Sequence, residues 1–424
     1  MIRGKKNIKC GLIGERLSHS FSPQIHSYLA DYSYELFEMS EGEVELFLKS
    51  DRFDSTNVTI PYKKTVMPFL DEVSEEALRI GSVNTITKTS SGGLRGDNTD
   101  YFGFSYMLHK AGITVKNKNV LILGTGGSSM TARTLCEDMG AKKISIVSRT
   151  GEINYDNVYD ICSDSEIIIN TTPVGMYPNN LVSPIDLGRF KHLESVADII
   201  YNPSKTKLLL DAERLGVKYT NGLSMLVAQA KRASELFLCE SIDDGEIDKI
   251  VSLIENATLN IVLIGMPGCG KSTIASLLAE KTRRNFVDTD TLTEEFEGRS
   301  IPDIFARDGE EYFRSLETEA AKKAGKYSSH IIATGGGMVL REENYDPLKQ
   351  NGVIFFIERN VSQLTRDGRP LSLSADLSEM YKNRLPLYQK FADHTVRNDG
   401  SVDDCVNEII RLFSRSAKHE IIGD

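Results

Sequence analysis

The chain has 424 residues, 40% hydrophobic and 26% charged, with a formal net charge of -10 and a pI near 5.4. This length suits two or three globular domains. The acidic balance argues against a nucleic-acid or anionic-membrane partner, and no apolar run reaches the roughly 18 residues that a membrane helix needs. Six cysteines without CxxC spacing and seven histidines without HxxxH spacing indicate neither a disulfide framework nor a zinc site. With no signal peptide evident, we expect a cytoplasmic protein.

Short apolar runs rich in β-branched residues alternate with helical patterns such as 129–139 and 274–282. Runs of this kind that end in Gly, Asn or Ser are typical of buried strands. The alternation predicts an α/β fold whose parallel sheets are covered by helices on both faces. The acidic stretch 240–257, which we expect to be partly helical, is the best candidate for a joint between domains. The predicted strands are KCGLIG, NVLILG, KISIVS, EIIIN, VADIIY, NIVLIG, HIIAT and VIFFIE.

Four polar clusters interrupt the apolar pattern of the first hundred residues. The first, SHSFSP at 18–23, would direct three hydroxyls to one side in an extended chain, which suits a polyhydroxylated or carboxylated small molecule. Taken alone, it fits a helix N-terminus better, with Ser22 as the cap and Pro23 behind it. The other clusters are NVTIPYKK at 57–64, SVNT at 82–85 and GDNTD at 96–100, which singly would also fit an exposed lysine or a polar turn.

A glycine-rich turn, GTGGSS at 124–129, follows one of the predicted strands. Glycine at 124 and 126 allows a tight turn and close approach to a pyrophosphate, whose charge the following helix N-terminus favours. The next strand ends at Ser148-Arg149-Thr150. Domains that bind NAD usually carry an acidic residue there for the ribose, whereas arginine is suited to a 2′-phosphate. The pattern therefore predicts a Rossmann domain that prefers NADPH to NADH.

In order and spacing these clusters resemble shikimate dehydrogenases, with their SxS-Pro, NVTxPxK, VNT and GDNTD motifs. The resemblance continues through NTTPVGM at 170–176, DIIYNPSKT at 198–206 and NGLSMLVAQA at 221–230, and spans about residues 7–240. Ser148 departs from the Asn-Arg-Thr of the family, although Arg149 is kept. The resemblance implies that Ser20, Ser22, Thr59, Lys63, Asn84, Asp100, Tyr201 and Gln229 hold 3-dehydroshikimate. For NADPH it implies Gly124, Gly126, Gly127, Ser128, Ser148, Arg149, Thr150, Thr172, Gly175, Met176 and Gly222.

Reduction of a ketone requires a proton for the developing alkoxide as well as a hydride. The resemblance places Lys63 and Asp100 together at the reacting carbonyl as the catalytic pair. An ammonium beside a carboxylate can both stabilise the oxyanion and deliver a proton, and either residue could be the immediate donor. Quinate, which has a similar shape, is an alternative substrate.

The segment 260–273, NIVLIGMPGCGKST, satisfies the GxxxxGK[ST] pattern between an apolar strand and a helix. This is the context of a phosphate-binding loop. Its backbone N–H groups would cradle phosphates, Lys271 would neutralise their charge and Ser272 would hold Mg²⁺. Cys269 fits the role of a small filler better than a redox role.

The segment NFVDTD at 285–290 predicts a strand with two carboxylates on one side at its end. There Asp290 could orient or deprotonate a hydroxyl, and Asp288 could reach Mg²⁺ through water. Together with the phosphate loop, the motifs GEEYFRSLE, TGGG, RPL and RLPLY resemble those of shikimate kinases. The resemblance implies that Lys271 and Asp290 are catalytic and that shikimate is held by Asp290, Arg314, Gly336, Gly337 and Arg384. It implies Gly268, Cys269, Gly270, Lys271, Ser272, Thr273, Arg366 and Arg369 for ATP, and Ser272 and Asp288 for Mg²⁺. The lid segment RDGR at 366–369 is short for this family.

The expected organisation is an N-terminal α/β substrate domain and a Rossmann NADP-binding domain, followed by a P-loop NTPase-type α/β kinase domain. The expected bounds are 1–104 completed by 222–245, then 105–221, a linker at 246–258, and 259–424. The first hypothesis is a bifunctional enzyme that uses NADPH, ATP and Mg²⁺ on small molecules and is compatible with homo-oligomers. Two alternatives stay open: one half has lost its chemistry and only binds ligand, or a quinate-preferring dehydrogenase is joined to a different small-molecule kinase.

Overall fold

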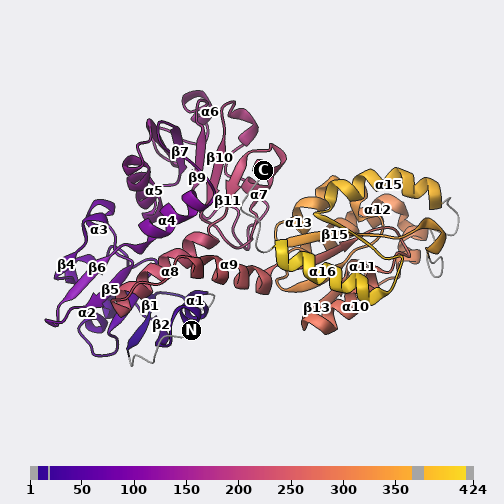
Figure 1. Cartoon of the computed structure of the whole chain (residues 1–424). Helices are drawn as coiled ribbons and strands as arrows, with labels where there is room; N and C mark the ends of the chain where they lie inside the picture. Colours follow the sequence, from indigo (N-terminus) through magenta and orange to yellow (C-terminus); the bar gives the residue numbers. More distant parts are fainter. Residues whose placement is uncertain (1–7, 18–19, 365–376, 417–424) are drawn as a thin grey trace.

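The computed structural model describes residues 8–17, 20–364 and 377–416. It contains three separate β-sheets, each covered by helices, arranged in chain order from the N-terminus (Figure 1). All eight runs predicted as strands form strands. Within the described ranges, no helix is long and apolar enough to cross a membrane.

The first sheet has the strand order β2-β1-β3-β5-β6-β4. Its first three strands are parallel, but β5 runs antiparallel to both β3 and β6. The prediction of parallel sheets was therefore wrong here, because the short polar strands β5 and β6, which a tight connection joins, lack the long apolar runs on which the prediction relied. The strands are β1 (Lys9–Gly14), β2 (Ser33–Glu38), β3 (Ser55–Val58), β4 (Glu72–Val73), β5 (Thr85–Lys88) and β6 (Leu94–Asp97).

Helices from two distant parts of the chain cover this sheet. The core on one face includes Val44, Phe47 and Phe53. A second cluster joins α1 to α8 and α9, which return to this domain after the second sheet. The helices are α1 (Ser22–Leu29), α2 (Glu41–Leu48), α3 (Glu75–Ile80), α4 (Thr99–Lys110), α8 (Leu223–Leu238) and α9 (Gly245–Thr258), with a 3₁₀ turn η1 (Met67–Phe69).

The second sheet is fully parallel, with the order β11-β10-β9-β7-β8, as predicted for a Rossmann domain. Separate apolar clusters lie on its two faces, one toward α4 and α5 and one toward α6 and α7. Its elements are β7 (Asn119–Leu123), α5 (Gly127–Asp138), β8 (Lys143–Val147), α6 (Val158–Ile161), β9 (Ile167–Asn170), η2 (Leu187–Arg189), β10 (Ser195–Asp198), α7 (Lys207–Arg214) and β11 (Lys218–Thr220).

The third sheet is also parallel, with the order β13-β14-β12-β15-β16 around the phosphate-loop strand β12. The residues of β12 and β15 are almost wholly buried in one large core. The elements are β12 (Asn260–Ile264), α10 (Lys271–Thr282), β13 (Asn285–Asp288), α11 (Thr289–Glu297), α12 (Ile301–Ala324), β14 (His330–Ala333), η3 (Met338–Leu340), η4 (Glu342–Asn344), α13 (Tyr345–Lys349), β15 (Gly352–Glu358), η5 (Val361–Gln363), α15 (Leu377–Phe391), β16 (His394–Arg397) and α16 (Val402–Ser416).

The stretch expected to join the domains is the helix α9, which runs between the two halves in Figure 1. Its apolar residues Ile247, Ile250 and Ile254 are buried against α1 and α8. Leu259 alone separates the end of α9 from β12. The guanidinium of Arg284 donates to the carbonyls of Asn256 and Leu259. These hydrogen bonds satisfy backbone carbonyls at the carboxyl end of α9, which have no partner within the helix. This joint is therefore a packed helix and not a flexible tether.

Candidate active sites

The first candidate site contains an ion pair between Lys63 and Asp100, whose Nζ and Oδ2 atoms lie 2.5 Å apart. Lys63 lies in the turn that follows β3, and Asp100 lies in the first turn of α4. Their side chains are 23% and 13% exposed, so the pair is shielded but open to a ligand. The structure thus brings together two residues that are 37 positions apart, as the sequence motifs implied.

A buried polar network lies beside this pair. The Oδ1 atom of Asn84 accepts from the backbone N–H of Thr99 at 2.7 Å, and the hydroxyl of Thr99 is 3.5 Å from Oε1 of Gln229. Asn57 donates to the carbonyl of Asn84 at 3.3 Å. Because buried polar groups are costly unless paired, this network fixes the side chains around the ion pair. Asn57 is the first residue of the NVTxPxK motif, but it was not among the site residues predicted from the sequence.

Phe21 and Ser22 of the first cluster form the start of a helix, as the capping pattern favoured, and not an extended chain. Phe21 has helical backbone angles, and α1 begins at Ser22. Phe21, not Ser22, is the N-cap residue, and the hydroxyl of Ser20 accepts from the N–H of Ser22 at 3.2 Å. Pro23 explains the difference, since its fixed φ favours a first helical turn. Phe21 also contacts the ring of Tyr201 edge-on at 5.9 Å, so the two motifs that contain these residues meet.

The predicted dinucleotide turn connects β7 to α5. Gly124 has φ +107 and lies against Thr171 and Thr172, so this position requires glycine. Gly126 and Gly127 instead face open space, where a Cβ atom would meet no heavy atom within 4 Å. Together with the N-terminus of the 12-residue α5, they leave room for a pyrophosphate. Ser128 follows in the first turn of α5, and Ser148, Arg149 and Thr150 follow the end of β8, with Arg149 and Thr150 exposed. The residues present therefore fit NADP.

The loop after β9 carries Thr172, Gly175 and Met176. The N–H and hydroxyl of Thr172 both donate to Oδ1 of Asn170, at 3.0 and 2.7 Å. The side-chain amide of Asn170 in turn donates to the buried Asp198 at 3.0 Å, where burial raises the pKa of the carboxyl to about 7. Gly175 has φ +99, and Met176 is exposed. This segment is therefore an ordered loop at the carboxyl ends of β9 and β10.

Gly222 has a packing role that its motif did not reveal. It precedes α8, and a Cβ atom there would lie 1.9 Å from the carbonyl oxygen of Ile199. The close approach of the backbones at Gly222 and Ile199 is therefore enough to require glycine at this position, independently of any contact with a cofactor.

The second candidate site is the phosphate loop between β12 and α10. Gly265, Gly268 and Gly270 all have positive φ, which shapes the turn. The ammonium of Lys271 is buried in the loop and donates to the carbonyls of Gly265 and Met266, at 2.8 and 3.1 Å. Cys269 is buried, in agreement with a role as a small filler, and its carbonyl accepts from the side-chain amide of Asn398 at 2.8 Å.

The carboxylates of Asp288 and Asp290, at the end of β13, line one cavity beside the phosphate loop, but their geometry differs from the one predicted. The strand ends at Asp288, which is the N-cap of α11 and accepts from the N–H of Asp290 at 2.9 Å. Asp290 therefore lies in the first turn of a helix and not in a strand. The hydroxyl of Ser272 donates to Asp288 at 3.0 Å. A hydroxyl paired with a carboxylate beside a phosphate loop is a donor set that suits Mg²⁺ completed by phosphate oxygens and water. In the described ranges, no cluster of three or more His, Cys, Asp or Glu offers a separate metal site.

A cavity of about 240 Å³ joins the phosphate loop to the glycine turn after β14. Lys271, Asp290, Arg314 and Arg384 all line it. Arg384 donates to the carbonyl of Gly336 at 3.0 Å. Three lysine or arginine side chains in one cavity of this size favour a small anionic ligand.

Glu317 is a cavity residue that the sequence-based selection missed. Its carboxylate accepts from Arg314 at 2.7 Å, one turn earlier on α12, and burial raises its pKa. A Cβ atom at Gly337 would lie 2.0 Å from the Arg314 guanidinium, so glycine at 337 and the carboxylate together fix this arginine. The signal was available: Glu317 is the last residue of the GEEYFRSLE motif, and i,i+3 pairs share a helix face.

Arg366 and Arg369, predicted for ATP, lie outside the described residues, as does the short lid segment between them. Thr273 is exposed in the first turn of α10, next to Ser272.

Comparisons with known proteins relate the two halves of the chain to two different families. The model of the shikimate dehydrogenase substrate binding domain matches residues 12–86, and that of shikimate kinase matches residues 267–414. An NADP-dependent shikimate dehydrogenase of Clostridium beijerinckii is 38% identical over 266 residues, covering 58% of this chain and 97% of the relative.

Solved structures show the same relationship for the first half. A chorismate mutase/shikimate 5-dehydrogenase fusion protein from Clostridium acetobutylicum has a TM-score of 0.56 at 38% identity, covering 59% of this chain and 97% of that one. A shikimate dehydrogenase crystallised with NADP⁺ has a TM-score of 0.52 at 31% identity, covering 58% and 95%. The chain therefore belongs to the shikimate dehydrogenase family and carries a shikimate kinase domain behind it, which makes it a bifunctional enzyme of the shikimate pathway with NADP-dependent oxidoreductase and kinase activities.

Proposed function

We propose that the first half reduces 3-dehydroshikimate to shikimate and that the second half phosphorylates the 3-hydroxyl of this shikimate. Two observations carry the proposal. The ion pair of Lys63 and Asp100 is shielded but accessible, and one cavity joins the phosphate loop to Asp290, Arg314 and Arg384. NADPH, when bound, supplies the hydride, and ATP with Mg²⁺ supplies the phosphoryl group.

In the dehydrogenase site, the Lys63 ammonium would stabilise the developing alkoxide, and the pair with Asp100 would provide its proton. Asn84 and Gln229, held by the Thr99 network, would orient the ring hydroxyls. Ser20, Ser22, Thr59 and Tyr201 would bind the rest of the substrate. Phe21 contacts Tyr201, so the motif that contains Ser20 and Ser22 lies beside the motif that contains Tyr201. This contact supports a shared substrate-binding role for these three residues.

For the cofactor, the turn at Gly124, Gly126 and Gly127 with Ser128 would receive the pyrophosphate, and Thr172, Gly175 and Met176 would lie beside the nicotinamide. Arg149, with Ser148 and Thr150, would bind the 2′-phosphate. Arginine suits this role because its guanidinium forms charge-assisted hydrogen bonds to phosphate.

Arg149→Gln should therefore lower kcat/KM for NADPH by about 10- to 100-fold and leave kcat/KM for NADH within about twofold. The reason is that only NADPH carries the 2′-phosphate. Steady-state reduction with each nucleotide measures the ratio. Arg133→Gln, which removes an exposed arginine paired with Glu137 on α5, is the control. Equal losses with both nucleotides in Arg149→Gln would contradict the assignment.

In the kinase site, Arg314 and Arg384 would hold the carboxylate of shikimate, and Asp290 would orient or deprotonate its hydroxyl. The backbone at Gly336 and Gly337 would complete the contact. The phosphates of ATP would be bound by Lys271 together with Gly268, Cys269, Gly270 and Thr273. We propose that Arg366 and Arg369 also bind ATP. Ser272 and Asp288 would hold Mg²⁺.

Gly337→Ala should raise KM for shikimate by roughly tenfold or more, because the new methyl group would displace Arg314. Phosphorylation assays at varied shikimate measure this. Gly400→Ala is the matched control, since a Cβ atom there meets no heavy atom within 4 Å. The dehydrogenase rate of each sample shows that the chain is folded. An unchanged KM in Gly337→Ala would contradict the position proposed for shikimate.

We also propose the domain bounds 1–104 with 222–245, 105–221 and 259–424, joined through 246–258. The many contacts of α8 with α4 and α1 support the return of 222–245 to the first domain.

The full chain should convert 3-dehydroshikimate, NADPH and ATP into shikimate 3-phosphate. Omission of ATP should stop the reaction at shikimate, and shikimate with ATP should release ADP without NADPH. A chain that performs only one step would support the alternative that the other half merely binds ligand. Faster oxidation of quinate than of shikimate would favour the other alternative.

A further inference from the structure

Two loops of the NADP-binding domain contact a single turn of the kinase domain. The turn consists of Gln350 and Asn351, between α13 and β15, and we call it the docking turn. Its two residues are 0% and 6% exposed. The two loops are 171–183, after β9, and 199–206, after β10. Residues of a kinase domain are therefore buried against the cofactor half of a dehydrogenase.

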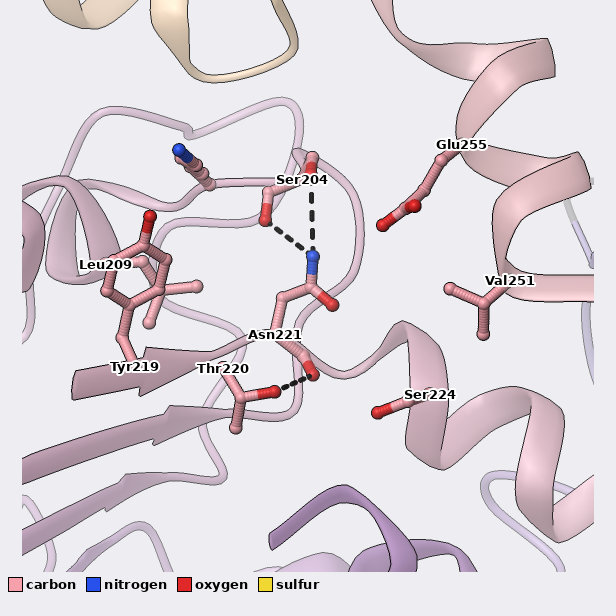
Figure 2. A pocket seen from close by; sticks show the side chains of 9 residues that line it. Ser204, Leu209, Tyr219, Thr220, Asn221, Ser224, Val251 and Glu255 are labelled. Carbon is pink, nitrogen blue, oxygen red and sulfur yellow. Dashed lines mark hydrogen bonds between the residues drawn. The ribbon is translucent and has the colours of Figure 1, made fainter. Parts of the chain in front are cut away.

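The loop 199–206 contacts the docking turn through its backbone. The N–H of Ser204 donates to Oδ1 of Asn351, and the N–H of Lys205 donates to the carbonyl of Gln350, both at 2.8 Å. From the other side, the side-chain amide of Asn221 donates to the carbonyl of Ser204 at 3.0 Å (Figure 2). Ser204 is thus held between its own domain and the kinase domain.

The loop 171–183 contacts the same two residues through side chains. The amide nitrogen of Asn351 donates to the hydroxyl of Tyr177 at 3.0 Å, and this hydroxyl donates to the carbonyl of Gly325 at 3.2 Å. Asn180 donates to the side-chain oxygen of Gln350. Asn351 therefore uses its oxygen for one loop and its nitrogen for the other, so a single amide links the two.

The first loop carries the residues proposed to lie beside the nicotinamide, and the second carries Tyr201, which is proposed to bind the substrate. Met176 is adjacent to Tyr177, and Thr172 is tied through Asn170 to Asp198. The hydroxyl of Thr206, at the end of the second loop, also donates to Asp198, at 2.7 Å. The loops are thus joined inside the NADP-binding domain at Asp198 and outside it at Asn351.

We propose that Asn351, assisted by Gln350, is a positioning residue for the dehydrogenase reaction: it holds both loops in the arrangement that receives the nicotinamide. The inference rests on the proposed position of Thr172 and Met176 beside that ring. Loops are ordinarily mobile surface segments, and a buried amide that satisfies partners in both restricts their conformations before the cofactor binds. The kinase domain thereby serves as part of the dehydrogenase scaffold.

A neighbouring contact separates this role from simple attachment of the domains. Asp346 of α13 forms ion pairs with Arg214 and Lys207 of α7. These pairs cross the same interface through side chains of α7 and α13, and neither pair involves a side chain of the two loops. Loss of Asp346 should therefore weaken attachment of the domains without disturbing the loops directly.

The experiment compares Asn351→Ala, Tyr177→Phe and Asp346→Ala in the full chain. Asn351→Ala should raise KM for NADPH and the Kd for NADP⁺, measured by titration, by roughly five- to fiftyfold. Amides of 171–183 should exchange hydrogen faster in the nucleotide-free protein. Tyr177→Phe should show a smaller change, and the double variant should be no worse than Asn351→Ala, because both disrupt one contact. Asp346→Ala should leave all three measurements within about twofold, and kinase kcat should stay unchanged throughout, which also reports folding.

An unchanged KM and exchange rate in Asn351→Ala would overturn the inference, as would an equal effect in Asp346→Ala. Thr172→Ala separates this failure from failure of the proposed function. If Thr172→Ala weakens NADPH binding and Asn351→Ala does not, the nicotinamide position stands and the positioning role is wrong. If neither variant affects NADPH, the nicotinamide does not lie beside this loop, and the inference fails with that position.

Discussion

Lys271→Met should lower shikimate-dependent ADP release by about 10²–10³-fold, while reduction of 3-dehydroshikimate stays within about twofold of the unchanged chain. The ammonium is buried inside the phosphate loop, at 2.8 Å from the carbonyl of Gly265. Methionine has a similar length and fills the same space without charge, so the loop should keep its shape. Loss of the positive charge beside the transferred phosphoryl group then accounts for the lower rate.

Lys281→Met is the matched control for this variant. It lies on the same helix, α10, but its ammonium pairs with Asp403 near the surface. We expect no more than a twofold change in kinase rate, since exposed pairs contribute little. A Lys271→Met chain with undiminished kinase activity would disprove the role of this lysine in phosphoryl transfer.

Lys63→Ala should lower the rate of 3-dehydroshikimate reduction by roughly 10²–10⁴-fold, with kinase activity unchanged. The substitution removes the cation that would stabilise the alkoxide and leaves Asp100 without its 2.5 Å partner. NADPH oxidation at saturating substrate measures kcat, and the kinase assay on the same sample confirms that the chain is folded.

Lys64→Ala provides the comparison, because this neighbouring lysine is exposed. It should behave like the unchanged chain. If Lys63→Ala retained full reductase turnover, the acid/base role of the ion pair would be wrong.

The position of the kinase cavity bears on how the two steps are linked. The docking turn lies at the amino ends of β12 and β15, where the backbone N–H of Asn260 donates to the carbonyl of Asn351 at 2.7 Å. The phosphate loop lies at the opposite end of β12. A strand of this length spans about 17 Å, so the packed sheet separates the kinase cavity from the domain interface. The kinase domain therefore contacts the dehydrogenase half through the amino ends of its strands, and its cavity does not face the dehydrogenase.

Much of the molecule could be predicted from local sequence. The apolar runs that became β7, β12 and β15 are continuous and β-branched, and such runs form strands wherever they are buried. Gly124 and Gly270 could be predicted because they stand at motif positions where a tight turn requires glycine. Both have positive φ angles and close contacts in the structure. Lys271, Ser272 and the Lys63 motif could be named because their chemistry depends on short, regular spacing.

Other features depended on contacts between distant residues. The antiparallel β5 is decided by pairing with β3 and β6, to which its short polar sequence gives no guide. For Glu317, the i,i+3 spacing from Arg314 was visible in the sequence, but its burial in the cavity was not.

The sequence by itself determined the two nucleotide-binding patterns and the residues expected to perform the chemistry, since these follow from glycine conformation and from side-chain charge at short spacing. Only the tertiary structure decided that α9 is a packed joint and that Asn351 of the kinase domain contacts both loops of the NADP-binding domain. The physical reason is that such contacts join elements that are separate in the sequence, by more than a hundred positions between Asn351 and either loop and between α9 and α1. They form only when the assembled sheets place both partners together and away from water.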